Sequence, residues 1–151
     1  MGTRGFNRDL AQLTKTEVSV LEHLAEGLTT REVAETMGIT PRTLGGHLAH
    51  IRDKLIVTDR PVMVHAAYMG EQLQRPDAAE APGEFTQRDH DLWNLLATKP
   101  LPEIGQSLKV SRHTARGMIK DLTVRAGARS ETHVVKLGHA YGILGAEVTA
   151  R

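Results

Sequence analysis

The chain contains an internal repeat, and this feature limits the folds open to it more than any other. Residues 13–73 are echoed by residues 85–144, with equivalent positions about 71 residues apart. Residues 32–55 read EVAETMGITPRTLGGHLAHIRDKL, and residues 103–126 read EIGQSLKVSRHTARGMIKDLTVRA. Apolar positions coincide along both stretches, as in the pairs Val33 and Ile104, Ile39 and Val110, and Ile51 and Leu122. Because a repeated segment builds a repeated structural unit, two similar units are expected.

Each copy carries the start signals of four helices. In the first copy, helices are expected to begin after Thr14, Thr29, Thr40 and Asp59. The first two starts are capping boxes, completed by Glu17 and Glu32, and Gly38 can end the second helix in a left-handed conformation. The fourth helix is expected to reach Leu73. In the second copy the start signals are Thr86, Pro102, Ser111 and Ser130. The sequence therefore predicts an all-α fold in which each copy has the layout of a helix-turn-helix.

The composition between the copies indicates a linker. Residues 74–84 are rich in Pro, Ala and acidic residues and offer no apolar face. We therefore expect one domain at residues 1–73, a linker at 74–84, and a second, more divergent domain at 85–151. Such a linker permits the domains either to pack together or to swing freely.

Several classes of protein are disfavoured by the residues that are absent. The chain has no cysteine, which excludes disulfides and thiolate zinc sites and suits a reducing compartment. No apolar run approaches the length of a membrane span. Paired catalytic acids, nucleophile motifs, metal-ligand spacings and glycine-rich phosphate loops are also missing. We expect a cytoplasmic bacterial protein without cofactor or metal, and not an enzyme.

Positive charge is concentrated in the second copy. The net charge of the whole chain is only +1. Residues 109–129 nevertheless hold six Lys or Arg and one Asp, whereas the equivalent residues 38–58 hold three Lys or Arg and one Asp. A basic helix-turn-helix is typical of a surface that binds duplex DNA.

The first copy resembles a known family of proteins. The run LTKTEVSVLEHLAEGLTTREVAETMGIT, followed by PRTLGGHLAHIRDKL, is similar to the four-helix DNA-binding domain of LuxR-type, GerE-like regulators, which is also the output domain of NarL and FixJ response regulators. The second copy resembles it more weakly. The resemblance implies that the third helix enters the major groove of double-stranded DNA and that the fourth helix makes dimer contacts. Here the fourth helices are expected to form an internal pseudo-dimer or a homodimer.

The resemblance also identifies the positions that touch bases. In the first copy these positions hold Gly45, Gly46 and Ala49, none of which offers a polar side chain. In the second copy they hold Arg116, Gly117 and Lys120, and a well-placed Arg can bind guanine through two hydrogen bonds. Base reading is therefore assigned mainly to the second copy. The adjacent glycines reflect either close approach of a partner to the backbone or drift in a module that no longer reads bases.

The expected DNA-contacting residues come from both copies. They are Ser111, Arg112, His113, Arg116, Gly117, Lys120 and Arg125 in the second copy, and Thr30, Arg31, Thr40, Arg42, Gly45, Gly46 and Lys54 in the first. The leading hypothesis is a nucleoid-associated regulator of transcription that binds specific duplex sequences. The alternative is a protein-interaction module that binds RNA polymerase or another regulator with little DNA contact.

Overall fold

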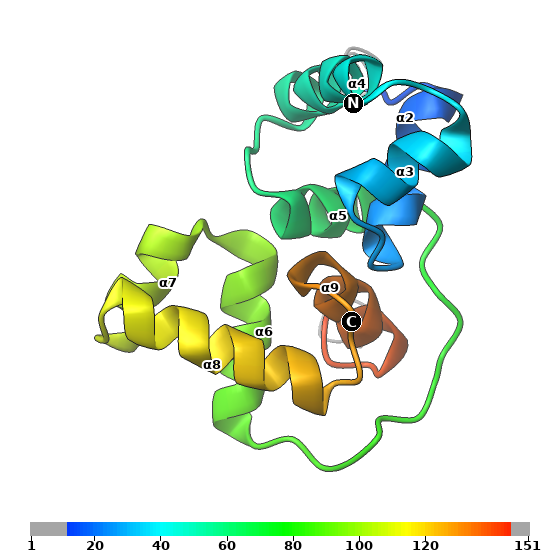
Figure 1. The fold of residues 1–151 in the computed structure, drawn as a ribbon. Coiled ribbons are helices and arrows are strands. Elements are labelled where there is room, and N and C mark those ends of the chain that lie inside the picture. The colour runs from blue at the N-terminus through cyan, green and yellow to red at the C-terminus, as the bar shows by residue number, and fades with distance from the viewer. Residues whose placement is uncertain (1–11, 146–151) are drawn as a thin grey trace, which may run out of the picture.

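The computed structural model describes residues 12–145, which form eight α-helices and no β-strand (Figure 1). The helices of the first unit are α2 (Lys15–Ala25), α3 (Thr30–Met37), α4 (Pro41–Leu55) and α5 (Arg60–Met69). Those of the second unit are α6 (Gln87–Thr98), α7 (Leu101–Leu108), α8 (Arg112–Arg125) and α9 (Glu131–Ala140). The all-α prediction is confirmed, and the helices follow the order that the repeat predicts.

Side-chain caps fix most of the helix starts. Six of the eight helices begin after a Thr or Ser whose hydroxyl oxygen accepts a hydrogen bond from a backbone N–H three residues later; these are Thr14, Thr29, Thr40, Thr86, Ser111 and Ser130. At Thr14, Thr29 and Thr86 an acidic side chain completes the capping box. The start of α7 differs from the expectation: the helix begins at Leu101, so Pro102 is its second residue.

The helix ends show how the two units diverged. The backbone leaves α3 in a left-handed conformation at Gly38 (φ 69°), and it leaves α7 in the same way at Lys109 (φ 60°). After α4 and α8 the left-handed residues are Ile56 (φ 57°) and Gly127 (φ 78°). At each of these two pairs of equivalent helix ends, the left-handed residue is therefore a glycine in only one of the two units. At Ile56 a β-branched residue occupies a conformation that favours glycine, and its side chain is 87% exposed.

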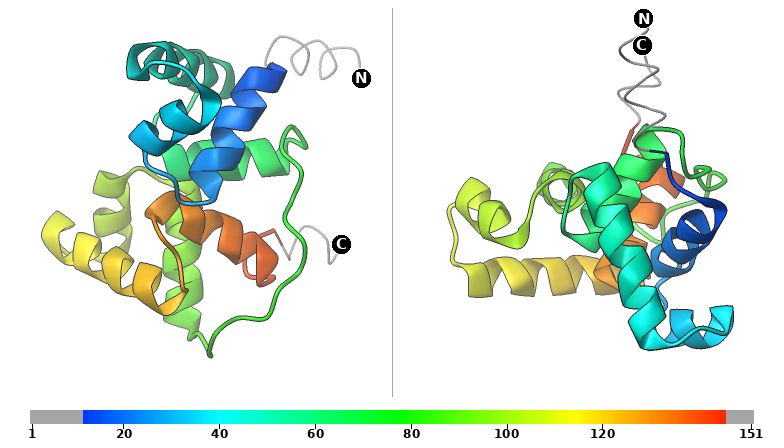
Figure 2. Two further views of the ribbon diagram at one scale, coloured as in Figure 1. Left: turned by 45° about the vertical axis from the view of Figure 1, so that its right-hand side comes forward. Right: turned by 90° about the horizontal axis from the view of Figure 1, so that it is seen from above.

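The two units pack against each other through equivalent helices. The fourth helices α5 and α9 contact one another, α5 also packs against α6, and α2 packs against α9 (Figures 1 and 2). Each unit thus contributes its first and fourth helices to the interface. The buried apolar side chains of both units belong to one continuous cluster. This packing leaves the third helices, α4 and α8, at the periphery of the molecule.

The fourth helix of the first unit is shorter than the sequence suggests. It ends at Met69, not Leu73, because the chain turns at Gly70 and Glu71. Leu73 is still buried, but it belongs to the turn after the helix, where Gln72 Oε1 accepts a hydrogen bond from the Leu13 N–H at 2.6 Å. The prediction that the helix reaches Leu73 is therefore wrong, because Leu73 packs into the core from the turn that follows the helix.

The segment 74–84 contains no helix or strand, and it runs beside the second unit. The Ala79 N–H donates a hydrogen bond to the carbonyl oxygen of Ala140, at the end of α9, at 2.9 Å. Among residues 12–145, none of the helices is long and apolar enough to cross a membrane.

Candidate nucleic-acid interface

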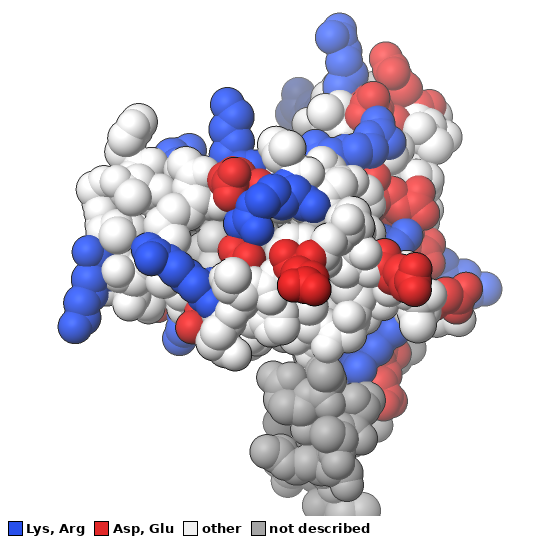
Figure 3. Space-filling model, turned by 90° about the horizontal axis from the view of Figure 1, so that it is seen from below, with Lys and Arg blue, Asp and Glu red and all other residues white. Residues whose placement is uncertain are grey.

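The exposed face of α8 carries the second unit's basic side chains. Ala115, Ile119 and Leu122 are buried, at spacings of four and three residues, so one side of the helix faces the core of its unit. Ser111, Arg112, His113, Arg116, Gly117 and Lys120 are all exposed. Seen from below, the left-hand end of the molecule, where Figure 1 places α7 and the start of α8, carries Lys and Arg side chains, while most of the Asp and Glu side chains lie further right (Figure 3).

Three cations of this face have no acidic partner among the described residues, unlike Arg129 and Lys136 of the same unit. In the part of the chain that the structure describes, Arg112, Arg116 and Lys120 form no ion pair. Elsewhere in the unit, Arg129 lies near Glu32 at 4.0 Å, and Lys136 pairs with Glu26 at 3.3 Å. Three unpaired cations along one side of a helix form a surface of positive potential that is open to an anionic partner.

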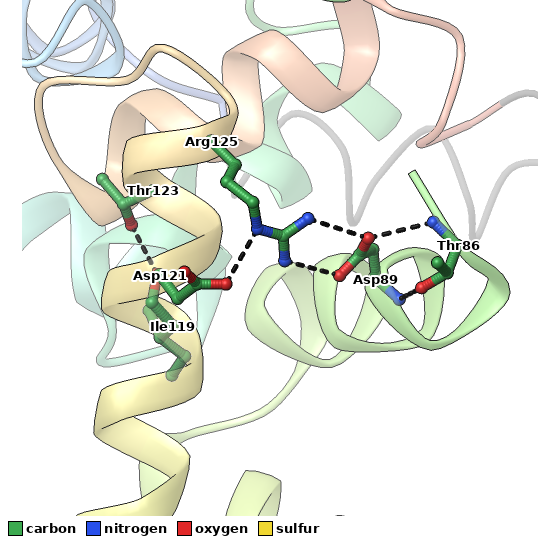
Figure 4. A network of polar contacts seen from close by, with 6 residues as sticks. All are labelled: Thr86, Asp89, Ile119, Asp121, Thr123 and Arg125. Atoms are coloured by element: carbon green, nitrogen blue, oxygen red, sulfur yellow. Dashed lines mark hydrogen bonds and ion pairs between the residues drawn. The ribbon is translucent and has the colours of Figure 1, made fainter. Parts of the chain in front are cut away.

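Arg125 is an exception on α8, because it holds the helix to its own unit. Its guanidinium donates to both carboxylate oxygens of Asp89 on α6, at 2.7 and 3.0 Å, and to Asp121 at 2.8 Å (Figure 4). Asp89 also accepts a hydrogen bond from the N–H of Thr86, the residue that caps α6. The hydrogen bonds from Arg125 outweigh burial and hold the pKa of Asp89 well below its usual value. The same contacts raise the pKa of Arg125.

The first unit repeats this pair with different residues. Lys54, near the end of α4, donates to Glu17 on α2 at 2.8 Å, and Glu17 also accepts from the N–H of Thr14. Burial opposes the charge on Glu17, but the hydrogen bonds from Lys54 and Thr14 prevail and lower the pKa of the carboxyl. Lys54 and Arg125, both expected to contact DNA, therefore position the third helices within their units. The two pairs are equivalent in the two copies, but their partners lie 37 and 36 residues apart along the chain, so the sequence did not reveal them.

The third helix of the first unit presents a smaller and less charged surface. Arg42, Gly45 and Gly46 are exposed on α4, and Ala49 is partly buried. Thr40 is exposed at the start of the helix, where its hydroxyl caps α4 and contacts Thr43. The candidates on α3 are Thr30, which is half-buried, and Arg31, which is exposed. These residues lie on the same unit but do not form a basic cluster like that of α8.

The packing of the units brings the first unit beside α8. Arg116, Lys120 and Thr123 line an open groove of about 770 Å³ together with the starts of α5 and α9. The residues of those two starts are Thr58, Asp59, Arg60, Pro61, Ser130, Glu131 and Thr132. Arg60 is an exposed cation from the first unit that the sequence did not associate with α8. No local pattern could have revealed this proximity, because it depends on how the two units dock.

The described residues contain no group of three or more His, Cys, Asp or Glu side chains arranged to hold a metal ion. His65 and His139 come together at the interface between α5 and α9, with Nδ1 of His65 3.0 Å from Nε2 of His139. This contact is a pair and lacks the further ligands that a structural metal site requires.

Comparison with known proteins identifies the first unit. Residues 11–67 match the family described as bacterial regulatory proteins, luxR family. The chain is 36% identical over 58 residues to the transcriptional regulatory protein UhpA of Salmonella typhimurium, covering 38% of this chain and 30% of that protein. It is 42% identical over 52 residues to the transcriptional regulatory protein LnrK of Bacillus subtilis, covering 34% of this chain and 24% of that protein.

A third relative is the transcriptional activator protein ExaE of Pseudomonas putida, which is 35% identical over 66 residues, covering 44% of this chain and 31% of ExaE. The chain thus spans about a third or less of the length of these relatives. No solved structure matches it significantly. The family match and the helix-turn-helix geometry agree, and residues 11–67 are a helix-turn-helix domain of the LuxR family.

Proposed function

We propose that this chain is a transcription regulator that binds double-stranded DNA and reads bases mainly with α8 of its second unit. The observation that carries the proposal is the row of exposed, unpaired cations Arg112, Arg116 and Lys120 on the outward side of the third helix. In this proposal residues 1–73 and 85–151 are two LuxR-type domains joined by residues 74–84. The site of action is the bacterial nucleoid, in the cytoplasm.

The charge on α8 suits a phosphate-rich partner. Each Lys or Arg that neutralises a phosphate releases a condensed counterion, which favours binding at low salt. Arg116 can in addition engage guanine through two hydrogen bonds, and each such pair discriminates between bases by about 1–3 kcal/mol. Exposed Ser111 caps α8 and exposed His113 lies in its first turn, where both can contact the backbone of a bound strand.

The first unit has a supporting role in this proposal. Arg60 lies in the groove beside Arg116 and Lys120, where it can contact a phosphate flanking the bases read by α8. On α4, Arg42 and the cap Thr40 offer backbone contacts, but Gly45 and Gly46 offer no base contact. The packing of α5 on α9 supports an internal pseudo-dimer, because equivalent helices meet within one chain.

The test is a selection from a pool of random duplexes, followed by titration of the enriched sequence at several salt concentrations. We expect one sequence to be enriched and its affinity to fall steeply as salt rises. Replacing both Arg116 and Lys120 by Ala should abolish enrichment. The charge-matched control replaces Lys15 and Arg88, two exposed cations outside α8, and should retain it. Equal loss in both variants, or no enrichment by the wild type, would reject the proposal.

A second candidate function is favoured by two exposed apolar side chains. Ile56, at the end of α4, is 87% exposed, and Val124, near the end of α8, is 71% exposed. Such residues suit contact with a protein, for example RNA polymerase or another regulator. Capture of purified RNA polymerase by the wild type, unchanged in the variant lacking Arg116 and Lys120 but lost on Ile56→Ser, would support this function in place of DNA reading.

A further inference from the structure

Gly117 lies close to the most outward direction of α8, on the side opposite its buried residues. With 3.6 residues per turn, it lies about 170° around the helix axis from the mean direction of the buried residues Ala115, Ile119 and Leu122. Gly117 is exposed and in the middle of a 14-residue helix. Glycine is unfavourable at such a place relative to alanine, because it loses more backbone freedom on folding.

Among residues 12–145, no packing contact explains this glycine. A Cβ atom built on Gly117 would meet no atom within 4 Å, and its φ angle is not in the left-handed region. Two other helical glycines, Gly138 and Gly105, have no room for a side chain. A Cβ on Gly138 would lie 2.5 Å from Trp93 Nε1, and a Cβ on Gly105 would lie 3.1 Å from the Val110 carbonyl oxygen. Packing within the described part of the fold therefore does not require a glycine at position 117.

The other copy supplies an independent comparison. Between residues 32–55 and 103–126, only three equivalent pairs are identical: Glu32 and Glu103, Thr43 and Thr114, and Gly46 and Gly117. The two glutamates lie in the first turns of α3 and α7. The backbone N–H groups of the two threonines donate hydrogen bonds to the side chains that cap α4 and α8. The glycine pair has no such task, because a Cβ on Gly46 would also meet open space.

The surroundings of Gly117 suggest what approaches it. Its neighbours on the outward side are His113 and Lys120, one turn away in each direction, and Arg116 flanks it toward the groove beside α5. Arg116 and Lys120 thus lie on one side of a point where the helix has no side chain, and Thr114 and Asp121, each one turn from Gly117, lie on the other side. A helix is about 10–12 Å wide with its side chains, and the major groove is about 12 Å wide, so even one side chain at the apex limits insertion.

We propose that Gly117 is the point of closest approach between the α8 backbone and duplex DNA, and that it determines how deeply the helix enters the groove. This inference rests on the proposed DNA-binding function. With the backbone close to the base edges, Arg116 and Lys120 reach the bases from one flank of the helix. A side chain at position 117 would hold the helix away and shorten that reach.

The test separates stability from binding, since the two are expected to change in opposite directions. Gly117→Ala should raise the Tm by about 2–4 °C, because alanine favours the helix and meets no neighbour. The same variant should bind the selected duplex at least about tenfold more weakly. Gly117→Met, a good helix former with a larger side chain, should keep the Tm at or above the wild-type value and bind more weakly still. The control Ser107→Ala, on the exposed side of α7, should leave affinity unchanged.

Two results would overturn the inference, and they differ from each other. If the wild type binds its duplex and Gly117→Ala binds equally well or better, close approach is wrong while the proposed function stands. If the wild type binds no duplex, the proposed function fails and this inference fails with it.

Discussion

Tyr68 and His139 occupy equivalent positions in the two units, and their rings contact each other with centroids 4.7 Å apart. A residue that touches its own equivalent marks the centre of an interface built from the same surface on both sides, as in isologous dimers. Here one chain supplies both sides. The orientation of α4 relative to α8 is therefore set by the packing of α5, α9, α2 and α6 and does not depend on the linker alone.

Gly27 is predicted to be essential to this interface. It lies in the turn after α2 with φ at +93°, and a Cβ there would stand 2.7 Å from Cβ of Arg129 in the second unit. Gly27→Ala should destabilise the protein by about 2–4 kcal/mol, through both backbone strain and collision. Chemical denaturation measures this. The matched control is Gly127→Ala, where φ is +78° but no atom lies within 4 Å, so only the strain remains. Equal losses in the two variants would contradict a tightly packed interface at Gly27.

The pair formed by Asp89 and Arg125 is predicted to anchor α8. The side chain of Asp89 is only 12% exposed, so Arg125→Ala leaves a nearly buried carboxylate without its main partner. We expect a loss of about 1–3 kcal/mol in the free energy of unfolding. The double variant Asp89→Asn with Arg125→Ala should recover part of it, since the unpaired charge is removed. A double-mutant cycle gives the coupling energy, and a value near zero would show that the pair does not hold the helix.

Sequence reasoning succeeded where the determinants are local. Thr14, Thr29 and Thr40 cap helices because a hydroxyl and a backbone N–H three residues later meet whenever the chain turns into a helix. Arg116 and Lys120, which the resemblance placed on the outward side of the third helix, are exposed, whereas Ala115, Ile119 and Leu122 form its buried side. These features depend on spacing along the chain, which is visible without coordinates.

Features that depend on docking of the units were missed. Tyr68 is buried because α5 packs against α9 as well as against its own unit, a docking that the sequence left open. Arg60 lies beside Arg116 for the same reason. Arg125 and Lys54, which were expected to contact DNA, also form ion pairs within their units. Their partners Asp89 and Glu17 are more than 30 residues away, so local spacing could not pair them.

The interface histidine is predicted to make stability depend on pH. Burial, the neighbouring His65 and the positive charge of Arg75 lower the pKa of His139 to about 4, and Tyr68 packs on its ring. Because this pKa lies below that of the unfolded chain, about 6.5, the unfolded state takes up the proton first as the pH falls. Stability that is present above about pH 6.5 is therefore lost progressively toward pH 4.

The Tm of the wild type should accordingly be lower at pH 5 than at pH 7, and His139→Phe should show a smaller decrease. Part of the dependence should remain, because burial also lowers the pKa of His133. His113→Gln, at an exposed position on α8, is the control and should behave like the wild type. Parallel pH profiles for the wild type and His139→Phe would refute the assignment to His139.

The last prediction tests whether α4 lies against DNA. Gly45 and Ala49 occupy the places of Arg116 and Lys120, and a Cβ at position 45 meets no atom within 4 Å. Introducing Gly45→Arg and Ala49→Lys together should raise affinity for the selected duplex if α4 faces the phosphates. The slope of log affinity against log salt should steepen by up to about 1.8, because each neutralised phosphate contributes about 0.9.

The control Thr16→Arg with Glu22→Gln adds the same charge to exposed positions of α2, and it should change the slope much less. Should the α4 variant match that control, the first unit does not approach the duplex through its third helix. The first unit would then contribute to DNA binding only indirectly. Its helices α2 and α5 pack against α6 and α9, and these two helices position α8.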